Sequence, residues 1–226
     1  MTRLLAALSA AAMVAAHGLV TSPPAHTDPI VCPPDCDRIP ATAWVDPAAI
    51  PLAGKYNWPN LAHRAVPVQR PRFYFEDVCD IPPAPADPRS YVVAAKATVA
   101  NPPGQWQLQA QVLHWRGDVW LGGQLADEAV HSAVTALRAC QSIETEVSPS
   151  ITTDQPGRLA AVLTVAGTPT TIVHQYVVSH PQSGTIVELA MWASSPPLQN
   201  WRTVPDEQVF DALLAPLCDA YISSCR

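Results

Sequence analysis

The chain has little charge and no long apolar run. Of its 226 residues, 14% are charged, the formal net charge is −6, and the lysines and arginines form no cluster. A protein that binds nucleic acid usually presents such a basic cluster to the phosphates. No apolar run reaches the roughly 18 residues that a membrane-spanning helix requires. We therefore predict neither a nucleic-acid partner nor a membrane span.

The recurring motifs of enzyme active sites are also missing. The sequence contains no G-x-S-x-G, H-E-x-x-H, G-x-x-x-x-G-K-[ST] or G-x-G-x-x-G segment. Glu128 and His131 match half of a di-iron motif, but that site needs a second copy, which the chain does not have. We expect no enzymatic activity, no catalytic residue, no cofactor and no metal site.

The N-terminus has the pattern of an export signal. Thr2 and Arg3 give a positively charged start, and residues 4–16 form a run of small apolar side chains that ends in Val-Ala-Ala. Small residues at these last positions are typical of a signal-peptidase cleavage site. We predict a signal peptide over residues 1–16 and a mature chain, beginning near His17, that is secreted or lies in the periplasm or cell envelope.

Six cysteines acquire a meaning in an exported protein, because they are then expected to form disulfides. They are Cys32, Cys36, Cys79, Cys140, Cys218 and Cys225. Cys32 and Cys36 are near enough in sequence to bond locally, and Cys218 and Cys225 lie around the end of a predicted helix. This leaves Cys79 with Cys140. A zinc site is disfavoured, since the short paired spacing of zinc ligands is not repeated.

Prolines and aromatic residues are concentrated in the first part of the chain. Fifteen of the 25 prolines lie between Pro23 and Pro88, so this part is neither a helix nor a central strand. A solvated linker rarely has many aromatic residues, yet this part contains Trp44, Tyr56, Trp58, Phe73, Tyr74 and Phe75. We predict that residues 17–89 form an extended arm that packs on the globular part through Cys79.

Residues 90–226 alternate between strand and helix patterns. Alternation at period two predicts strands over residues 90–99, 105–116, 158–166, 170–179 and 185–193, whereas residues 149–157 are expected to form a loop. In the second strand Trp106 and Leu108 share the core face, while Gln107, Gln109 and Gln111 share a face that is expected to be wet. An antiparallel sheet of about five strands is the result.

Two helices are predicted to cover this sheet. Over residues 123–146, apolar residues recur at helical spacing on one side; they are Ala126, Ala129, Val130, Ala133, Leu137 and Cys140. The second helix is predicted to open with Pro205 in its first turn and to be kinked at Pro216. The fold class is therefore α+β, with two layers and a proline-rich N-terminal arm.

The hairpin between the last two strands brings together four polar and aromatic residues if its centre is Gln182. Tyr176 then lies opposite Glu188, and His174 and Trp192 share the same face. Such a patch is a candidate for binding a ligand or partner, so His174, Tyr176, Glu188 and Trp192 are the predicted ligand-binding residues. The alternative is that the arm covers this face and uses these groups for packing.

The layout resembles a known family. The segments from Thr42 to Leu52 and from Asp77 to Pro82, and the helix ending in Cys140, are similar to segments of the extracellular sensor domain of mycobacterial serine/threonine protein kinase H and of its stand-alone secreted relatives. The resemblance implies a disulfide between Cys79 and Cys140. The chain departs from the family in residues 184–192, which contain no cysteine.

The resemblance implies a sensor-like domain over residues 90–226 that binds and does not catalyse. We expect a secreted, disulfide-braced binding domain that recognises an unidentified extracellular small molecule or envelope protein. The alternative is a structural or accessory subunit of a cell-envelope complex that docks through the arm.

Overall fold

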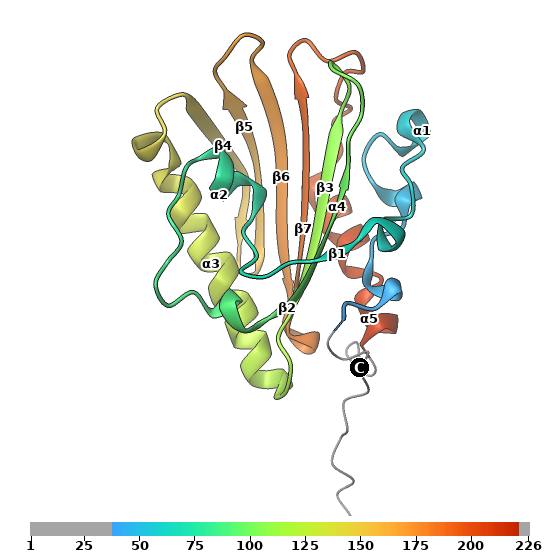
Figure 1. Ribbon diagram of the computed structural model, residues 1–226, viewed down its shortest axis with the longest axis vertical. Helices are drawn as coiled ribbons and strands as arrows, with labels where there is room; N and C mark the ends of the chain where they lie inside the picture. Colours follow the sequence, from blue (N-terminus) through green and yellow to red (C-terminus); the bar gives the residue numbers. More distant parts are fainter. Residues whose placement is uncertain (1–37, 222–226) are drawn as a thin grey trace, which may run out of the picture. The chain divides into compact units, whose positions relative to one another are not determined.

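Seven strands form one antiparallel sheet in the computed structural model, which describes residues 38–221 (Figure 1). Their order across the sheet is β1-β2-β3-β7-β6-β5-β4. The strands are β1 (Val66–Pro67), β2 (Val93–Val99), β3 (Gln107–His114), β4 (Val147–Gln155), β5 (Arg158–Val165), β6 (Thr171–His180) and β7 (Thr185–Ser194). The α+β prediction is confirmed, whereas the sheet has two more strands than the five expected.

Helices cover both faces of the sheet. The helices are α1 (Ala53–Tyr56), α2 (Tyr74–Val78), α3 (Val119–Ile143), α4 (Asp206–Leu214) and α5 (Leu217–Ala220). In Figure 1, α3 crosses the front of the sheet, while α4 and α5 lie behind it. The hydrophobic residues form two separate cores, one on each face. The predicted two-layer arrangement is therefore wrong, because the two amphipathic helices pack on opposite faces. Among the described residues no helix is apolar over a length sufficient to cross a bilayer.

The long helix α3 begins four residues before the predicted start. The carboxylate of Asp118 accepts a hydrogen bond from the backbone N–H of Leu121 at 2.7 Å and caps the first turn. Gly122, which lies before the predicted start, and Gly123, at that start, are both buried inside the helix. A Cβ on Gly123 would lie 2.5 Å from the carbonyl oxygen of Pro181, so the close packing of α3 on this turn requires glycine. The predicted apolar stripe is confirmed, since all six of its residues are buried.

The segment that was predicted to be a loop, residues 149–157, belongs mainly to β4. This strand pairs with β5 alone and forms an edge of the sheet. Pro149 can occupy an edge strand because no second neighbour requires its missing N–H. The prediction failed because a proline and several short polar residues were taken as evidence for a loop.

The arm packs on both faces of the sheet, in agreement with the prediction that it lies on the globular part. Trp44, Trp58 and Leu61 belong to the core on the α4 side. Phe73 and Phe75 belong to the core on the α3 side. Between them, β1 pairs with β2 and forms the other edge of the sheet. The arm therefore passes around this edge and completes both cores.

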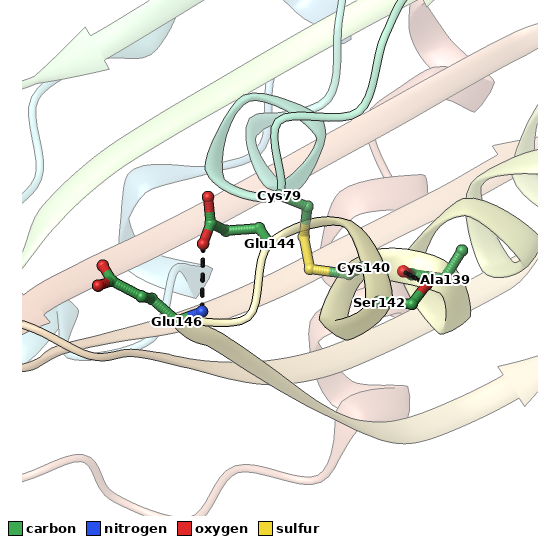
Figure 2. The surroundings of a disulfide bond; sticks show 6 residues. All are labelled: Cys79, Ala139, Cys140, Ser142, Glu144 and Glu146. Atoms are coloured by element: carbon green, nitrogen blue, oxygen red, sulfur yellow. Dashed lines mark hydrogen bonds between the residues drawn. A yellow bond between two sulfur atoms is a disulfide. The ribbon is translucent and has the colours of Figure 1, made fainter.

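The disulfide between Cys79 and Cys140 is formed, which confirms this predicted pair (Figure 2). It joins the end of α2 to the last turn of α3. Beyond α3, the carboxylate of Glu144 accepts a hydrogen bond from the N–H of Glu146 at 3.1 Å and shapes the turn into β4. Cys218 is disulfide-bonded too. The other predicted disulfide cysteines, Cys32, Cys36 and Cys225, lie outside the described residues, as does the predicted signal peptide.

The β6–β7 hairpin differs by one residue from the predicted register. His180 pairs with Thr185, so a four-residue connection, which includes the 3₁₀ turn Pro181–Ser183, joins the strands. The predicted centre at Gln182 assumed a connection with an odd number of residues. Tyr176 consequently lies opposite Leu189 instead of Glu188. A shift of one residue moves every side chain of one strand to the other face relative to its partner.

Candidate functional site

The four predicted ligand-binding residues lie on two different faces of the sheet. His174 and Tyr176 belong to the α4 face, and Glu188 and Trp192 belong to the α3 face. The prediction that these four residues share one face is therefore wrong, because the hairpin register differs by one residue from the predicted register. Tyr176 and Glu188 are buried, with exposed fractions of 3% and 0%, whereas Trp192 is half-buried.

Glu188 lies at the centre of a buried polar cluster on the α3 face. Its carboxylate accepts hydrogen bonds from the N–H of Tyr74 at 2.5 Å and from Nε2 of Gln175 at 3.0 Å. Longer hydrogen bonds come from Nε2 of Gln111 at 3.3 Å and of Gln109 at 3.4 Å. We call Glu188, Gln109, Gln111 and Gln175 the Glu188 cluster. Strands β3, β7 and β6, which are adjacent, place these four side chains together.

Two acceptors of the Glu188 cluster lack a hydrogen-bond partner among the described residues. They are Oε1 of Gln111 and Oε1 of Gln175, and both glutamines are completely buried. A buried carbonyl oxygen without a donor costs stability, so native proteins leave few of them. The cluster is thus organised to accept more hydrogen bonds than its neighbours provide.

Burial raises the pKa of Glu188 from its ordinary value of 4.5 to about 7. The hydrogen bonds from Tyr74, Gln175 and Gln109 act in the opposite direction, because they stabilise the carboxylate. A titratable carboxyl group is unusual in the middle of a sheet, where core side chains are normally apolar. Buried groups with strongly shifted pKa values are concentrated at functional sites.

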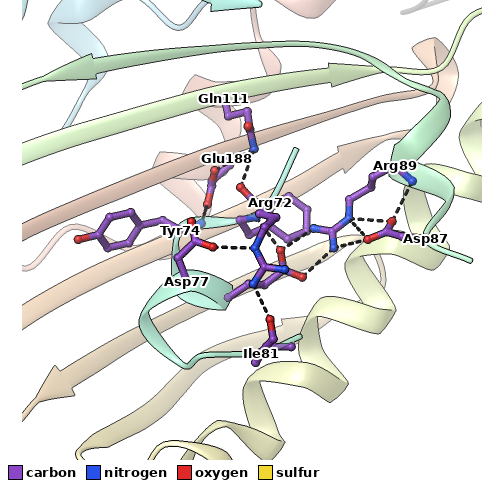
Figure 3. A network of polar contacts seen from close by, with 10 residues as sticks. Arg72, Tyr74, Asp77, Ile81, Asp87, Arg89, Gln111 and Glu188 are labelled. Carbon is purple, nitrogen blue, oxygen red and sulfur yellow. Dashed lines mark hydrogen bonds and ion pairs between the residues drawn. The ribbon is translucent and has the colours of Figure 1, made fainter. Parts of the chain in front are cut away.

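The end of the arm, together with the two residues that follow it, covers the Glu188 cluster. We call residues 70–91 the covering segment. Within it, the guanidinium of Arg89 binds both carboxylate oxygens of Glu76, at 2.7 and 2.8 Å. It also binds Asp87 at 2.6 Å (Figure 3). Burial alone would lower the pKa of Arg89, but hydrogen bonds to Glu76 and Asp87 raise it. This buried ion pair fixes the last part of the covering segment to α2.

The covering segment contacts the cluster through its backbone and stacks one ring on Trp192, which follows Glu188 in β7. Arg72 accepts a hydrogen bond at its carbonyl from Nε2 of Gln111 at 3.2 Å. The ring of Tyr74 stacks on Trp192, with centroids 4.3 Å apart, and both residues are half-buried. Burial, followed by the charges of Asp77 and Glu188, raises the pKa of Tyr74 to about 12. A pocket of about 440 Å³ lies within the covering segment and is lined in part by Arg70, Arg72 and Arg89.

The other two predicted residues take part in aromatic packing. The imidazole of His174 stacks on Trp201 with centroids 3.7 Å apart and contacts Trp106 at 5.5 Å. Burial lowers the pKa of His174 from 6.5 to about 4, although Asp206 opposes the shift. Tyr176 contacts the ring of Phe210 edge-on at 6.0 Å. These contacts hold the loop before α4 and the helix itself against the sheet.

Outside the Glu188 cluster, the metal-ligating and nucleophilic side chains of the described residues are scattered or buried. No group of three or more histidine, cysteine or acidic side chains among residues 38–221 is placed to hold a metal ion. His180 and Ser183 are within hydrogen-bonding distance, 2.8 Å, but Ser183 is 3% exposed and also bonds to Thr185. The acceptors of the Glu188 cluster, by contrast, are suited to holding a ligand that donates hydrogen bonds.

Sequence reasoning missed the glutamines of the Glu188 cluster and the ion pair above them. Gln109 and Gln111 were assigned to a wet face because they alternate with apolar residues, but the covering segment excludes water from that face. Gln111 lies directly opposite Glu188. A correct hairpin register together with the run of glutamines in β3 would have indicated this cluster.

Comparison with known proteins leaves the resemblance to kinase sensor domains as a prediction. No protein family model, curated protein or solved structure matches the chain.

Proposed function

We propose that the chain is an extracytoplasmic binding domain that accommodates a hydroxyl-rich small molecule, such as a saccharide unit, at the Glu188 cluster. The observation that carries the proposal is the pair of partnerless buried acceptors on Gln111 and Gln175 beside a buried carboxylate. Hydroxyl groups donate to such oxygens and also accept from glutamine N–H groups.

The half-buried ring pair supports the same ligand class. Trp192 and Tyr74 stack beside the cluster, and they offer a flat apolar surface next to convergent polar groups. Binding sites for small molecules commonly combine these two elements. We propose that Tyr74 and the adjoining part of the covering segment move away from Trp192 when the ligand enters.

An extracytoplasmic location is supported by the disulfide between Cys79 and Cys140, since structural disulfides persist mainly in oxidising compartments. The predicted signal peptide points to the same location. The alternative function, docking of an accessory subunit through the arm, is less favoured. Trp44, Trp58 and Phe75 of the arm are buried within the fold and do not present a surface to a partner.

Calorimetric titration of the purified protein with glucose, N-acetylglucosamine and trehalose tests the ligand proposal. We expect at least one of these saccharides to bind. Trp192→Ala and Gln175→Leu should each weaken this binding about tenfold or more, because one removes the apolar surface and the other a polar partner.

Trp201→Ala is the matched control, since Trp201 is also a half-buried tryptophan but belongs to the opposite face. It should leave the affinity unchanged. The proposal is wrong if none of the three saccharides binds, or if Trp192→Ala and Trp201→Ala reduce the affinity equally.

A further inference from the structure

Three large apolar residues are exposed in succession at the start of α3. Val119, Trp120 and Leu121 have exposed fractions of 54%, 70% and 51%. Successive residues of a helix point about 100° apart, so these side chains extend over most of the circumference of the first turn. They form a protruding knob, which we call the apolar tip, and not a flat apolar stripe.

The base of the apolar tip is firmly held. Gly122 and Gly123 follow it and are buried against Trp115, Gly184 and Pro181. Asp118 accepts hydrogen bonds from the N–H of Leu121 at its carboxylate and from the N–H of Gly122 at its carbonyl. Since the side chains of the tip are absent from both cores, their apolar character has no role in packing the fold.

The size of the apolar tip is unsuited to a protein–protein interface. Three half-exposed side chains offer an apolar area on the order of 300 Å², whereas a stable interface buries about 800 Å² on each partner. A second copy of the chain would gain too little from this contact. A small protruding knob that includes tryptophan has the shape and chemistry of an element that enters the headgroup region of a bilayer.

The charges near the apolar tip indicate the kind of membrane. Arg116 and Asp118 flank it with opposite signs, and Asp127 and Glu128 follow on the exposed side of α3. Attraction to anionic lipids requires clustered basic residues, and the whole chain has a net charge of −6. The surroundings of the tip therefore favour zwitterionic lipids.

We propose that the apolar tip, Val119–Trp120–Leu121, seats the protein peripherally in the headgroup region of a zwitterionic phospholipid membrane. This contact is independent of the Glu188 cluster. It would hold the binding domain at a membrane surface without a spanning segment in the described part of the chain.

Flotation of the full-length protein with vesicles tests the proposal. One set of vesicles consists of phosphatidylcholine, and the other contains phosphatidylglycerol as well. We expect the wild-type protein to float with phosphatidylcholine vesicles, and Leu121→Ser and Trp120→Ser each to lower the partition coefficient about tenfold, because apolar area is removed. Leu198→Ser is the matched control, since Leu198 is 66% exposed but lies outside the tip.

Several outcomes would overturn the proposal. They are a wild-type protein that floats with neither kind of vesicle, equal losses for Leu121→Ser and Leu198→Ser, and binding that requires phosphatidylglycerol. Light scattering without lipid tests whether a second copy of the chain binds the apolar tip. A dimer that Leu121→Ser dissociates would assign the tip to self-association instead. Circular dichroism checks that each variant is folded, which we expect because the substituted side chains are exposed.

Discussion

Two buried titratable side chains have opposite effects on stability at the scale of single residues. Glu188, on the α3 face, has a raised pKa, and His174, on the α4 face, has a lowered one. Burial is the first cause in both cases, because it disfavours the charged form of either group. Each group therefore links folding to pH in its own direction.

Glu188→Gln should change the pH dependence of stability above about pH 4.5. Between about pH 4.5 and 7 the folded protein keeps a proton on Glu188 that the unfolded chain has released, so this contribution to stability is lost as the pH rises. Relative to the wild type, the free energy of unfolding of Glu188→Gln should increase by about 3 kcal/mol across this window. Urea denaturation at several pH values measures it, and parallel profiles would contradict the expectation.

His174→Phe should reduce the loss of stability that acid causes. Below about pH 6.5 the unfolded chain binds a proton at His174 that the folded protein accepts only near pH 4, so acid weakens the wild type. Phenylalanine can stack on Trp201 but does not titrate, and the variant should lose less stability than the wild type between about pH 6.5 and 4. Thermal melts over this range measure the difference. An equal loss in both proteins would show that His174 is charged in the folded state.

At the scale of elements, two contacts fix the position of the long helix α3. One is the disulfide, and the other is the close approach of α3 to the 3₁₀ turn Pro181–Ser183. Cys79 and Cys140 are 61 residues apart, so their bond restricts a long loop of the unfolded chain. Gly123 holds the start of α3 next to the carbonyl of Pro181. These two contacts hold opposite ends of α3.

Replacing Cys79 and Cys140 by serine should lower the free energy of unfolding by about 4 kcal/mol in the chain-entropy description, given the length of the loop. The covering segment contains α2, whose C-cap is Cys79. Without the disulfide, the amide hydrogens of this segment should exchange faster than in the wild type. Urea denaturation and hydrogen exchange at Tyr74 measure the two effects. Unchanged exchange at Tyr74 would show that the Arg89–Glu76 ion pair suffices to hold the segment.

Gly123→Ala should destabilise the protein by about 1–3 kcal/mol, although alanine favours helices, because the new methyl group would meet the Pro181 carbonyl. Gly54→Ala is the control. Gly54 also lies in a helix, α1, but a Cβ there has nothing within 4 Å. Thermal unfolding compares the two variants, and equal stability would mean that the turn can shift without cost.

At the scale of the whole molecule, sequence patterns predicted most strands and both long helices because those segments are periodic. These patterns failed where tertiary contacts determine whether a face is buried or how two strands are aligned. Alternation in β3 identified two faces but not that both are covered, since Gln111 is as deeply buried as Leu108. The hairpin register depends on one residue in the turn, and this residue determined whether Tyr176 and Glu188 share a face.

The arm is a necessary part of the fold, which gives a prediction for truncation. A protein that begins at residue 66 lacks Trp44, Trp58 and Leu61, which complete the core on the α4 face. It should lose cooperative thermal unfolding, because a large apolar surface of the sheet becomes exposed. Circular dichroism and calorimetry test this outcome. A sharp melting transition in the truncated protein would show that residues 66–226 fold independently.

The pairing of β3 with β7 has a consequence for how the protein is made. Gln111 and Glu188 are adjacent in the sheet but are far apart along the chain, so the ribosome completes β3 long before its central neighbour exists. Contacts of such long range form slowly. The sheet therefore cannot be completed until β7, the last strand along the chain, has been synthesised. The Glu188 cluster, which needs side chains from β3, β6 and β7, therefore forms only after nearly the whole chain has left the ribosome.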